Sequence, residues 1–490
     1  MLDQSFSNSN FNLIFLKENR KGIIKKRHLN QAYFDKHDEF KVVLDEKITL
    51  KNSKADNKLS QEELEGFAKR FDDINKAKEE IRNNLFSEYS DIVNDEESPF
   101  VFDIKYDKQN KIYTTNKDGV SFFSIKQLQR NLNKTFNVIQ ADRNKIIKQV
   151  YNLISDGFPK VIIRTDVKKF YESIPQGKLF EKIENNTLLS PLSKKLLKRL
   201  FFEFERIKDV TEMAPKKGIP RGLGVSAYLS ELYMRDIDSQ IKSLPDIIYY
   251  ARYVDDIIVI FSPKTKSQRR DYQSEIKEII NNHQLEIKDG SDGTPSKTFP
   301  YELLEKPLSK QQKLTFLGYK FIINQNYDTK IELSDDKLKR YVSRIELSIE
   351  TYNNDCKYDE KKARKMLIDR LKFLIGNYHL NHNKKNIKAG IFYTNQMLKL
   401  NNSEFNSLNT LNARMYNKFN RISPPINIGI DKARLIDFFK SKFCFKEGFN
   451  NKENHFFSFK FNQKEQSYYN IKYKRATNKF EVIKSIWKNE

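Results

Sequence analysis

Two adjacent aspartates, Asp255 and Asp256, lie between apolar, β-branched runs in the stretch "YARYVDDIIVIF" (250–261). A β-hairpin usually turns on Asn-Gly or Asp-Gly, which tolerate positive φ angles. Here the turn would consist of Val254 and the two aspartates, so neither turn geometry nor packing asks for a pair of like charges. The pair is therefore a candidate for chemistry, and a surface hairpin with a solvated acidic tip is the structural alternative.

A third carboxylate follows another apolar run. The stretch "KVIIRTDVKKFYESI" (160–174) begins as a buried strand that ends at Asp166. If this strand packs beside the hairpin, Asp166 and Asp255 converge at one edge of a sheet, where they repel each other unless a cation lies between them. Mg²⁺ is typically held by one or two carboxylates plus substrate phosphates, and two such ions can clamp both oxygens of a phosphoryl transfer. A structural salt bridge is the alternative reading of each aspartate.

The elements around these carboxylates alternate between strand and helix. After the strand at 160, the pattern predicts a helix at 225–241, a hairpin at 246–262, a helix at 267–283 and a strand pair at 313–323. Towards the N-terminus we expect a strand at "FKVVLDE" (40–46), a helix capped by Ser60, a loop at 94–99, and short strands followed by a basic helix in 100–150. Residues 331–490 are expected to be mainly helical.

The composition bounds the class of protein. A chain of 490 residues is expected to form two or three packed units. Its 89 Lys and Arg against 65 Asp and Glu give a formal net charge of +24, which favours a polyanionic partner such as nucleic acid, although a Lys-rich solvated surface would explain it too. Two cysteines and the absence of any apolar run of ~20 residues predict no disulfide framework, zinc site or membrane span. We expect a reducing, soluble, cytoplasmic setting.

The order of the motifs resembles the reverse transcriptase family over roughly residues 140–325. The stretches that carry the resemblance are "QADRNKII" (140–147), "TDVKKFY" (165–171), "GIPRGLGVS" (218–226), "YVDD" (253–256), "SKT" (296–298) and "FLGYKF" (316–321). The resemblance implies an α+β right-hand polymerase: N-terminal extension and fingers at 1–150, a palm with an antiparallel sheet carrying YVDD at 151–325, and a helical thumb and nucleic-acid-binding extension at 326–490.

The resemblance also implies roles for single residues. Asp166 and Asp255 would be metal ligands with Asp256 in support, and the backbone carbonyl of Val167 would join the metal shell. Nucleotide-binding roles would fall to Tyr171 as the gate against a ribose 2′-hydroxyl, Arg143 at the triphosphate, Lys297 near the leaving pyrophosphate, and Arg221 and Gly222. Primer and template contacts would fall to Gly218, Pro220, Leu317, Gly318 and Tyr319.

Several of these residues have a simpler reading. Tyr171 could be a core aromatic residue, Lys297 a surface lysine, and Arg143 the partner of a nearby carboxylate. Arg221 departs from the family pattern, which usually has Gln there. An Arg adds positive charge beside the template and cannot make the same amide contacts. This departure puts ordinary, broad template use in doubt and leaves the metal ligands unchanged.

By this resemblance the expected activity is RNA-directed DNA synthesis from dNTPs with two Mg²⁺ ions, for which Mn²⁺ could substitute. The expected partners are an RNA template such as a non-coding RNA, the DNA product, a partner defence protein and a second copy of the chain. The Arg221 departure and the opening "DQSFSNSNF" are similar to bacterial reverse transcriptases of antiviral, abortive-infection defence. The residues leave open an RNA-synthesising or untemplated nucleotidyl transferase, and a catalytically inactive RNA-binding scaffold.

Overall fold

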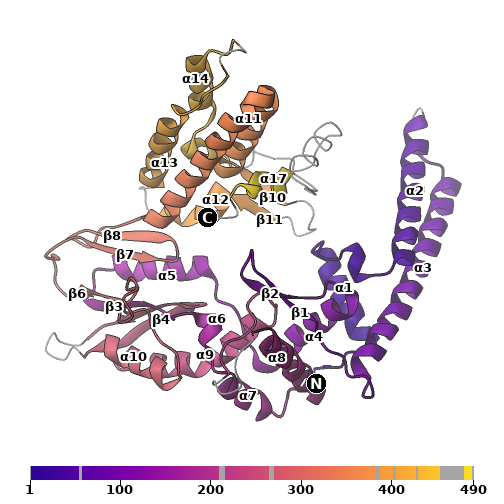
Figure 1. The fold of residues 1–490 in the computed structure, drawn as a ribbon, viewed down its shortest axis with the longest axis horizontal. Coiled ribbons are helices and arrows are strands. Elements are labelled where there is room, and N and C mark those ends of the chain that lie inside the picture. Colours follow the sequence, from indigo (N-terminus) through magenta and orange to yellow (C-terminus); the bar gives the residue numbers. More distant parts are fainter. Residues whose placement is uncertain are drawn as a thin grey trace. The chain divides into compact units, whose positions relative to one another are not determined.

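The computed structural model describes residues 2–54, 58–208, 216–263, 270–380, 387–400, 404–425, 429–452 and 479–487. The chain forms two compact units (Figure 1). Unit 1 comprises 1–141, 165–257 and 270–298, and unit 2 comprises 142–164, 258–269 and 299–490. Most of the basic and aromatic stretch at 468–480, part of the predicted nucleic-acid-binding extension, lies outside the described residues. Among the described helices, none is long and apolar enough to cross a membrane.

Unit 1 begins with helices. They are α1 (Asn8–Arg20), η1 (Lys26–His28), α2 (Gln31–Ser53), α3 (Gln61–Asn94) and α4 (Gly119–Phe136). The predicted cap is confirmed: Ser60 accepts from the backbone N–H of Glu63, whose side chain accepts in return from Ser60. The predicted strand at 40–46 is wrong, because these residues belong to α2, which packs along α3 and places the ring of Phe40 4.8 Å from that of Phe71.

The remaining elements of unit 1 surround the carboxylate motifs. A short antiparallel hairpin is formed by β1 (Ile104–Asp107) and β2 (Ile112–Thr115), as expected for 100–150. The helices are α6 (Phe170–Ser173), α7 (Gln176–Glu184), α8 (Pro191–Lys208), α9 (Ser226–Lys242) and α10 (Tyr272–Asn282). Helices α9 and α10 confirm the two helices predicted on either side of the YVDD hairpin.

The central sheet has the strand order β4 (Ile247–Tyr253), β5 (Asp256–Phe261), β3 (Lys160–Asp166) and β6 (Phe299–Leu303). Strand β3 pairs with β6 in antiparallel register, Lys160 opposite Leu303 and Arg164 opposite Phe299. The apolar residues 257–261 of β5 are wholly buried, and 161–163 of β3 nearly so. These continuous apolar runs are typical of central strands covered on both faces. Strands β3 and β5 therefore lie side by side, as the sequence predicted.

Unit 2 combines a helix, a small sheet and a helical C-terminal half. It contains α5 (Arg143–Ser155) and a three-stranded antiparallel sheet of β7 (Gln312–Phe316), β8 (Tyr319–Ile323) and β9 (Thr329–Leu333). The later elements are α11 (Asp335–Ile375), β10 (Asn377–Leu380), β11 (Ile387–Gly390), α12 (Ile391–Asn395), η3 (Gln396–Leu400), α13 (Glu404–Phe419), α14 (Lys432–Lys442), α15 (Phe445–Asn450) and α17 (Lys479–Ser485). The predicted helical character of 331–490 is confirmed for the described residues.

Candidate active site

The two strand-end carboxylates meet in unit 1. Asp166 ends β3, and Asp255 immediately precedes β5, its neighbour in the sheet. The backbone N–H of Val167 donates to the carbonyl oxygen of Asp255 at 3.1 Å, which ties the two motifs together at the backbone. The predicted convergence of Asp166 and Asp255 is confirmed, whereas their role as metal ligands remains a prediction.

The turn that carries Asp255 has an uncommon backbone conformation. Val254 has a φ angle of 62°, in the left-handed region. A β-branched residue is disfavoured there because its side chain is crowded against its own backbone. Such a conformation persists only where the surroundings enforce it, and it is found preferentially at functional sites. This turn is therefore held by contacts around it and not by its own sequence preference.

Arg252 supplies one of those contacts. Its guanidinium donates to the carbonyl oxygen of Val254 at 3.0 Å, and the residue is 7% exposed. The same group is held by Glu231 at 2.7 Å and by Asp238 at 2.8 Å, both on α9. Tyr250 adds a hydrogen bond to Asp238 at 2.6 Å. Helix α9 thus fixes Arg252, and Arg252 in turn holds the strained residue next to Asp255.

Arg252, Glu231 and Asp238 are not among the residues predicted from the sequence. The available signal was a charged residue inside a strand that is otherwise apolar and aromatic. A buried arginine requires acidic partners, and the preceding helix at 225–241 offers three acidic residues.

The carboxylates of Asp166 and Asp256 lie close enough to Asp255 for their negative charges to act on it. Burial raises the pKa of Asp255, and the negative charges of Asp166 and Asp256 raise it further. A carboxyl group in this position binds either a proton or a cation more readily than an ordinary surface aspartate. The electrostatics of the turn therefore favour a bound cation.

Two lysines already face Asp166. Lys288 lies 2.5 Å from one of its carboxylate oxygens, and Lys297 lies 3.1 Å from the other. The side chain of Asp166 is 2% exposed, whereas that of Lys297 is 47% exposed. Burial by itself would lower the pKa of Lys288, but the hydrogen bond and charge of Asp166 and the charge of Asp255 raise it overall. The predicted residue Lys297 is thus brought to the site, and Lys288 is an addition to it.

Lys288 escaped the sequence analysis because its segment was not identified as a strand-like partner of Asp166. The N–H of Lys288 donates to the carbonyl of Asp166 at 2.8 Å, and the N–H of Lys168 donates to that of Glu286 at 2.8 Å. The alternation of buried Leu285 and Ile287 with polar residues in "QLEIK" was the signal for such an extended segment.

The donor set fits a hard divalent cation. The backbone of Val167 lies close to both carboxylate residues, since Val167 directly follows Asp166 and its N–H donates to the carbonyl of Asp255. Two carboxylates and a carbonyl are oxygen ligands of the kind that Mg²⁺ prefers. Within the described ranges, no three His, Cys, Asp or Glu side chains form a metal cluster by themselves. One or two carboxylates suffice for Mg²⁺ when substrate phosphates complete its shell.

Tyr171 lies within electrostatic reach of the carboxylates. It is half-buried on α6, and burial raises the pKa of its hydroxyl, against a hydrogen bond with Ser230 that lowers it. The charges of Glu231 and Asp255 raise the pKa further, and that of Arg221 lowers it. Its role, as the gate or as a core aromatic residue, remains a prediction.

The loop at 218–226 is anchored to the same part of unit 1. The N–H of Ile219 donates to the carbonyl of Tyr171 at 2.8 Å, and the Ser226 hydroxyl donates to the carbonyl of Pro220 at 2.6 Å. Gly218 has a φ angle of 92° and donates to the carbonyl of Ile174 at 2.7 Å. The loop is therefore connected to Tyr171 through its backbone.

Gly222 marks a close approach between this loop and β2. Its φ angle is 108°, and a Cβ atom at this position would lie 2.6 Å from the carbonyl oxygen of Tyr113. The N–H of Tyr113 donates to the carbonyl of Arg221 at 2.7 Å. Only glycine satisfies both the angle and the space, so the backbone of Arg221 is fixed against β2.

The remaining predicted residues belong to unit 2. Leu317 and Gly318 form the turn between β7 and β8, with φ angles of 45° and 76°. The guanidinium of Arg143 donates to the carbonyl of Leu317, at 3.1 Å from Nε, and lies 5.0 Å from the ring centre of Tyr319. Within unit 2, Arg143 thus contacts the predicted primer-binding turn.

Lys337, which the sequence analysis missed, lies beside Arg143. Its ammonium group is 5.1 Å from the centre of the same Tyr319 ring, and its nitrogen has no hydrogen-bond partner among the described residues. Burial lowers the pKa of Lys337 to about 7, helped by the positive charges of Arg143 and Arg340. Two cations close to a turn, one of them an ammonium group without a hydrogen-bond partner among the described residues, are an environment that favours an anion.

Part of the chain is similar to a known protein family. Residues 119–321, less than half of the chain, match the family described as reverse transcriptase (RNA-dependent DNA polymerase), so the chain contains a reverse transcriptase domain. The match and the mixture of helices with antiparallel sheets confirm the predicted α+β right-hand polymerase fold.

Three solved structures of telomerase are also similar. Telomerase from Candida tropicalis in complex with a TWJ fragment of telomeric RNA is 15% identical over 64% of this chain and 56% of that chain, with a TM-score of 0.30. The apo enzyme is 14% identical over 65% of this chain and 60% of that chain, with a TM-score of 0.30. Its form truncated from the C-terminal domain is 18% identical over 43% of this chain and 45% of that chain, with a TM-score of 0.28. The chain spans about half the length of these structures. No curated protein matches it.

Proposed function

We propose, from the reverse transcriptase domain in residues 119–321, that the protein is an RNA-directed DNA polymerase that makes DNA from dNTPs on an RNA template. The observation that carries the proposal is the meeting of Asp166 and Asp255 in unit 1, where the N–H of Val167 donates to the carbonyl of Asp255 at 3.1 Å. A scaffold that only binds RNA would have no use for crowded, partly buried carboxylates, since such groups are costly to keep.

Asp166, Asp255 and the carbonyl of Val167 would hold two Mg²⁺ ions, with Asp256 in support. Bound there, the ions would activate the primer 3′-hydroxyl and neutralise the departing pyrophosphate. The chain's own residues position the rest. Arg252 keeps the Asp255 turn in place through Val254.

Lys297 and Tyr171 would bind the incoming nucleotide, and Lys288 would remain paired with Asp166. Lys297, largely exposed and 3.1 Å from Asp166, can turn from that carboxylate to a phosphate once a cation neutralises Asp166. Lys288 is less exposed and would stay on Asp166. Tyr171 would crowd the 2′ position of the sugar and so select dNTPs over NTPs.

Arg143 and Lys337 would bind an anionic group at the turn of unit 2. The turn residues Leu317 and Gly318 offer backbone groups there, and the Tyr319 ring lies under both cations. A triphosphate or a phosphate of the primer strand fits this set, because guanidinium and ammonium groups favour phosphate oxygens.

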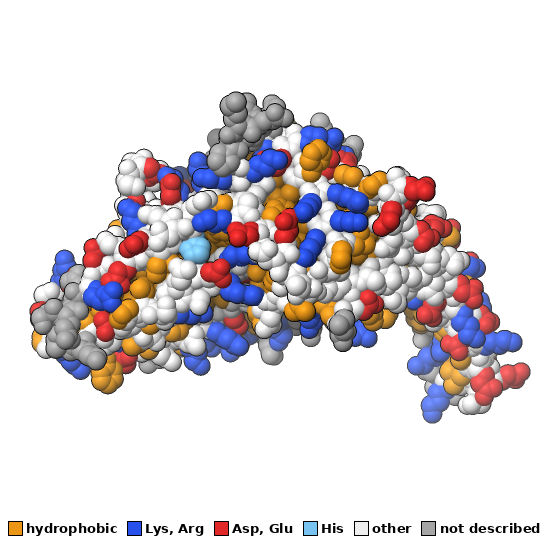
Figure 2. Space-filling model, turned by 90° about the horizontal axis from the view of Figure 1, so that it is seen from below, with side chains coloured by type: hydrophobic (Ala, Val, Ile, Leu, Met, Phe, Trp, Pro, Cys, Tyr) orange, Lys and Arg blue, Asp and Glu red, His pale blue; other side chains and the backbone are white. Residues whose placement is uncertain are grey.

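The biological setting that we propose is bacterial antiviral defence, with a non-coding RNA or a partner protein as associates. Its support is the resemblance of the N-terminal stretch and of Arg221 in the loop at 218–226 to defence-associated reverse transcriptases. Figure 2 shows one face of the molecule, where Lys and Arg side chains are interspersed with acidic ones. The net charge of +24 suits a nucleic-acid partner.

The test is nucleotide incorporation by the purified full chain with its bound nucleic acid. Wild type and Asp255→Asn are supplied with labelled dNTPs or NTPs and Mg²⁺, and the products are sequenced. We expect wild type to make DNA and the variant to be slower by at least about a thousandfold, roughly 4 kcal/mol of transition-state stabilisation. Asp236→Asn is the matched control, because this surface aspartate pairs with Lys182 at 2.7 Å.

The outcome separates the proposal from its alternatives. Incorporation of NTPs instead of dNTPs would replace the proposal by an RNA-synthesising enzyme, and products without template sequence would indicate an untemplated transferase. No incorporation by wild type with either Mg²⁺ or Mn²⁺, while RNA stays bound, would leave the scaffold reading in its place.

A further inference from the structure

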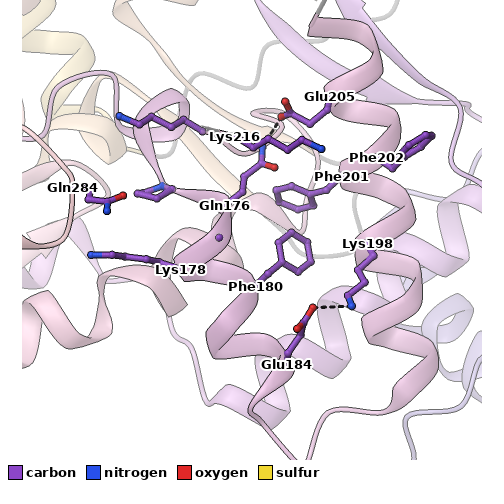
Figure 3. A pocket seen from close by; sticks show the side chains of 13 residues that line it. Gln176, Lys178, Phe180, Glu184, Lys198, Phe201, Phe202, Glu205, Lys216 and Gln284 are labelled. Carbon is purple, nitrogen blue, oxygen red and sulfur yellow. Dashed lines mark hydrogen bonds and ion pairs between the residues drawn. The ribbon is translucent and has the colours of Figure 1, made fainter. Parts of the chain in front are cut away.

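A cavity of about 650 Å³ lies in unit 1, between α7, α8 and the segment at 216–217 (Figure 3). None of Asp166, Asp255 and Asp256 lines it. Its walls are of two kinds, aromatic and basic, and each kind comes from a different set of elements. A cavity of this size accommodates a ligand as large as a nucleotide.

The aromatic wall consists of three phenylalanines. Phe180 on α7 and Phe201 on α8 meet edge to face, with ring centres 4.9 Å apart. Phe202, the next residue on α8, is 67% exposed although it is large and apolar. Phe201 is 3% exposed and supports the wall from behind, whereas Phe180 is half-buried. Phe180 and Phe202 therefore offer the surface on which a flat aromatic group can stack.

The basic wall has an excess of positive charge. The two acidic residues of the cavity are already engaged: Glu184 pairs with Lys198 at 2.7 Å, and Glu205 pairs with Lys208 at 3.0 Å. Glu205 also accepts a hydrogen bond from Gln176 at 2.6 Å. Figure 3 shows the Glu184–Lys198 pair at the foot of the cavity, away from Lys216.

Three further lysines line the cavity, and none has an acidic partner within the described ranges. Lys178 donates to the carbonyl of Asn282 at 3.0 Å, and Lys216 and Lys217 are exposed. Lys217 and Gln284 also line a neighbouring hollow of about 470 Å³. In that hollow Glu286 pairs with Lys168, and Asp289 with Lys277 at 2.6 Å. The first cavity therefore has a surplus of positive charge, whereas the charges that line the second hollow balance.

We propose that this cavity binds a base together with its phosphate, the base on the phenylalanine rings and the phosphate at Lys216 and Lys217. Stacking on aromatic rings beside a lysine-lined groove is the way in which proteins hold single-stranded nucleic acid. The source of this chemistry is either a free nucleotide or a unit of a nucleic-acid strand. The site goes beyond the proposed polymerase activity, since it lies apart from the carboxylates and its binding needs no divalent metal.

Binding is measured on the full chain in the Asp255→Asn background with EDTA, so that the polymerase site cannot turn over. The probe is a short 5′-fluorescein oligouridylate, and a version with 5-iodouridine is photo-crosslinked and mapped by mass spectrometry. The variants are Lys216→Gln/Lys217→Gln and Phe180→Leu/Phe202→Ala. The control is Lys195→Gln, which removes one exposed lysine of α8 that does not line the cavity.

We expect crosslinks in peptides from α7 and α8, and a roughly tenfold loss of affinity in the phenylalanine variant. The lysine variant should reduce the slope of log affinity against log salt by about 1.4, the value for two phosphate contacts on a single strand. Lys195→Gln should change neither. If ATP displaces the probe, the site binds a free nucleotide. If unlabelled oligouridylate displaces it and ATP does not, the site binds a nucleic-acid strand. Either result supports the proposal.

The proposal is overturned if no crosslink falls in α7 or α8 and both variants bind like Lys195→Gln. Melting curves of all variants are recorded, and Phe202→Ala alone, an exposed position, replaces the double variant if that variant unfolds. Wild-type incorporation is measured in parallel. Crosslinks without incorporation would remove the polymerase proposal and keep the site, whereas incorporation without crosslinks would remove only the site.

Discussion

Unit 1 contains a negative cluster, formed by Asp166, Asp255 and Asp256, whereas unit 2 contains a positive cluster, formed by Arg143 and Lys337. In unit 1, Asp255 lies close enough to Asp166 and Asp256 for their charges to raise its pKa. In unit 2, Arg143 helps to lower the pKa of Lys337 to about 7. Both arrangements cost free energy of folding, because like charges repel and burial disfavours the charged form. The proposed ligands, a cation in unit 1 and an anion in unit 2, would offset this cost.

The two clusters differ in how they are compensated and held. Asp166 has Lys288 and Lys297 as counter-charges, whereas Lys337 has no acidic partner among the described residues and lies beside the Tyr319 ring and two arginines, Arg143 and Arg340. The turn of Asp255 contains a strained valine and depends on Arg252. The turn of unit 2 contains Leu317, at a φ angle of 45°, beside Gly318, and Arg143 donates to the carbonyl oxygen of Leu317. Arg252 is itself held by Glu231 and Asp238, whereas no acidic side chain among the described residues pairs with Arg143. The negative cluster is therefore the more elaborately braced of the two, which suits a site whose geometry must be fixed for chemistry.

We expect the largest effect on stability from Arg252, which holds the turn of Asp255 through the carbonyl of Val254. Arg252→Met should lower the free energy of unfolding by roughly 3–5 kcal/mol, because it leaves Glu231 and Asp238 without their buried counter-charge. Thermal melting measures this loss. Incorporation of dNTPs should fall as well, since the carbonyl of Val254 loses its donor.

A triple variant separates positioning from folding. Arg252→Met/Glu231→Gln/Asp238→Asn removes the unpaired charges and should recover most of the melting temperature, but it should not recover incorporation or the Mg²⁺ concentration needed for half-maximal rate. If activity returns together with stability, Arg252 only supports the fold and the negative cluster needs no dedicated brace.

The sequence predicted the parts of this comparison that depend on periodicity and motif order. The apolar runs of β3 and β5 indicated two buried strands, and the carboxylates at their ends indicated the meeting of Asp166 and Asp255. Ser60 with Glu63 marked the start of α3 through a local capping pattern. These signals are local, so they can be read without knowing the partners.

The rest depends on contacts between distant segments. Lys288 reaches Asp166 only because the segment at 286–288 pairs with 166–168. Lys337 reaches Arg143 only because α11 and α5 fold onto the same turn. The error at 40–46 has the same origin: "FKVV" fits a strand by composition, but its packing partner is a helix. No window of sequence around these residues contains the partner that decides them.

The positive cluster can be tested by pH. Lys337 has a pKa of about 7 in the folded chain against 10.5 ordinarily, so its folding cost is present in full below pH 7 and is relieved as pH rises towards 10.5. Lys337→Met should therefore raise the free energy of unfolding by roughly 2–4 kcal/mol at pH 6. The gain should shrink steadily above pH 7. Urea titrations at several pH values measure it, with the exposed Lys339→Met as control.

The same variant, Lys337→Met, also tests whether Lys337 binds phosphate. If it binds phosphate, Lys337→Met should weaken nucleic-acid binding while it stabilises the fold, and the salt dependence of binding should decrease by about one unit of slope. A variant that is more stable and binds equally well would show that the positive cluster is a structural defect without a ligand.

The negative cluster should show the opposite pH dependence and a smaller effect. The folded-state pKa of Asp255 lies above its ordinary value of 3.8, so its cost is absent below that value and grows as pH rises through the folded-state pKa. With EDTA at pH 7, Asp255→Asn should be more stable than wild type by on the order of 1 kcal/mol. The gain should fade on acidification, whereas that of Lys337→Met fades on raising the pH.

Mg²⁺ then sharpens the contrast between the two clusters. It should raise the melting temperature of wild type and of Lys337→Met, because a ligand that binds only the folded state stabilises it, and it should leave Asp255→Asn unchanged. Asp236→Asn, which removes a surface charge, should respond like wild type. If Asp255→Asn is less stable than wild type with EDTA at pH 7, the aspartate makes a favourable structural contact. The repulsion among the carboxylates would then not be a free-energy cost that a bound cation relieves.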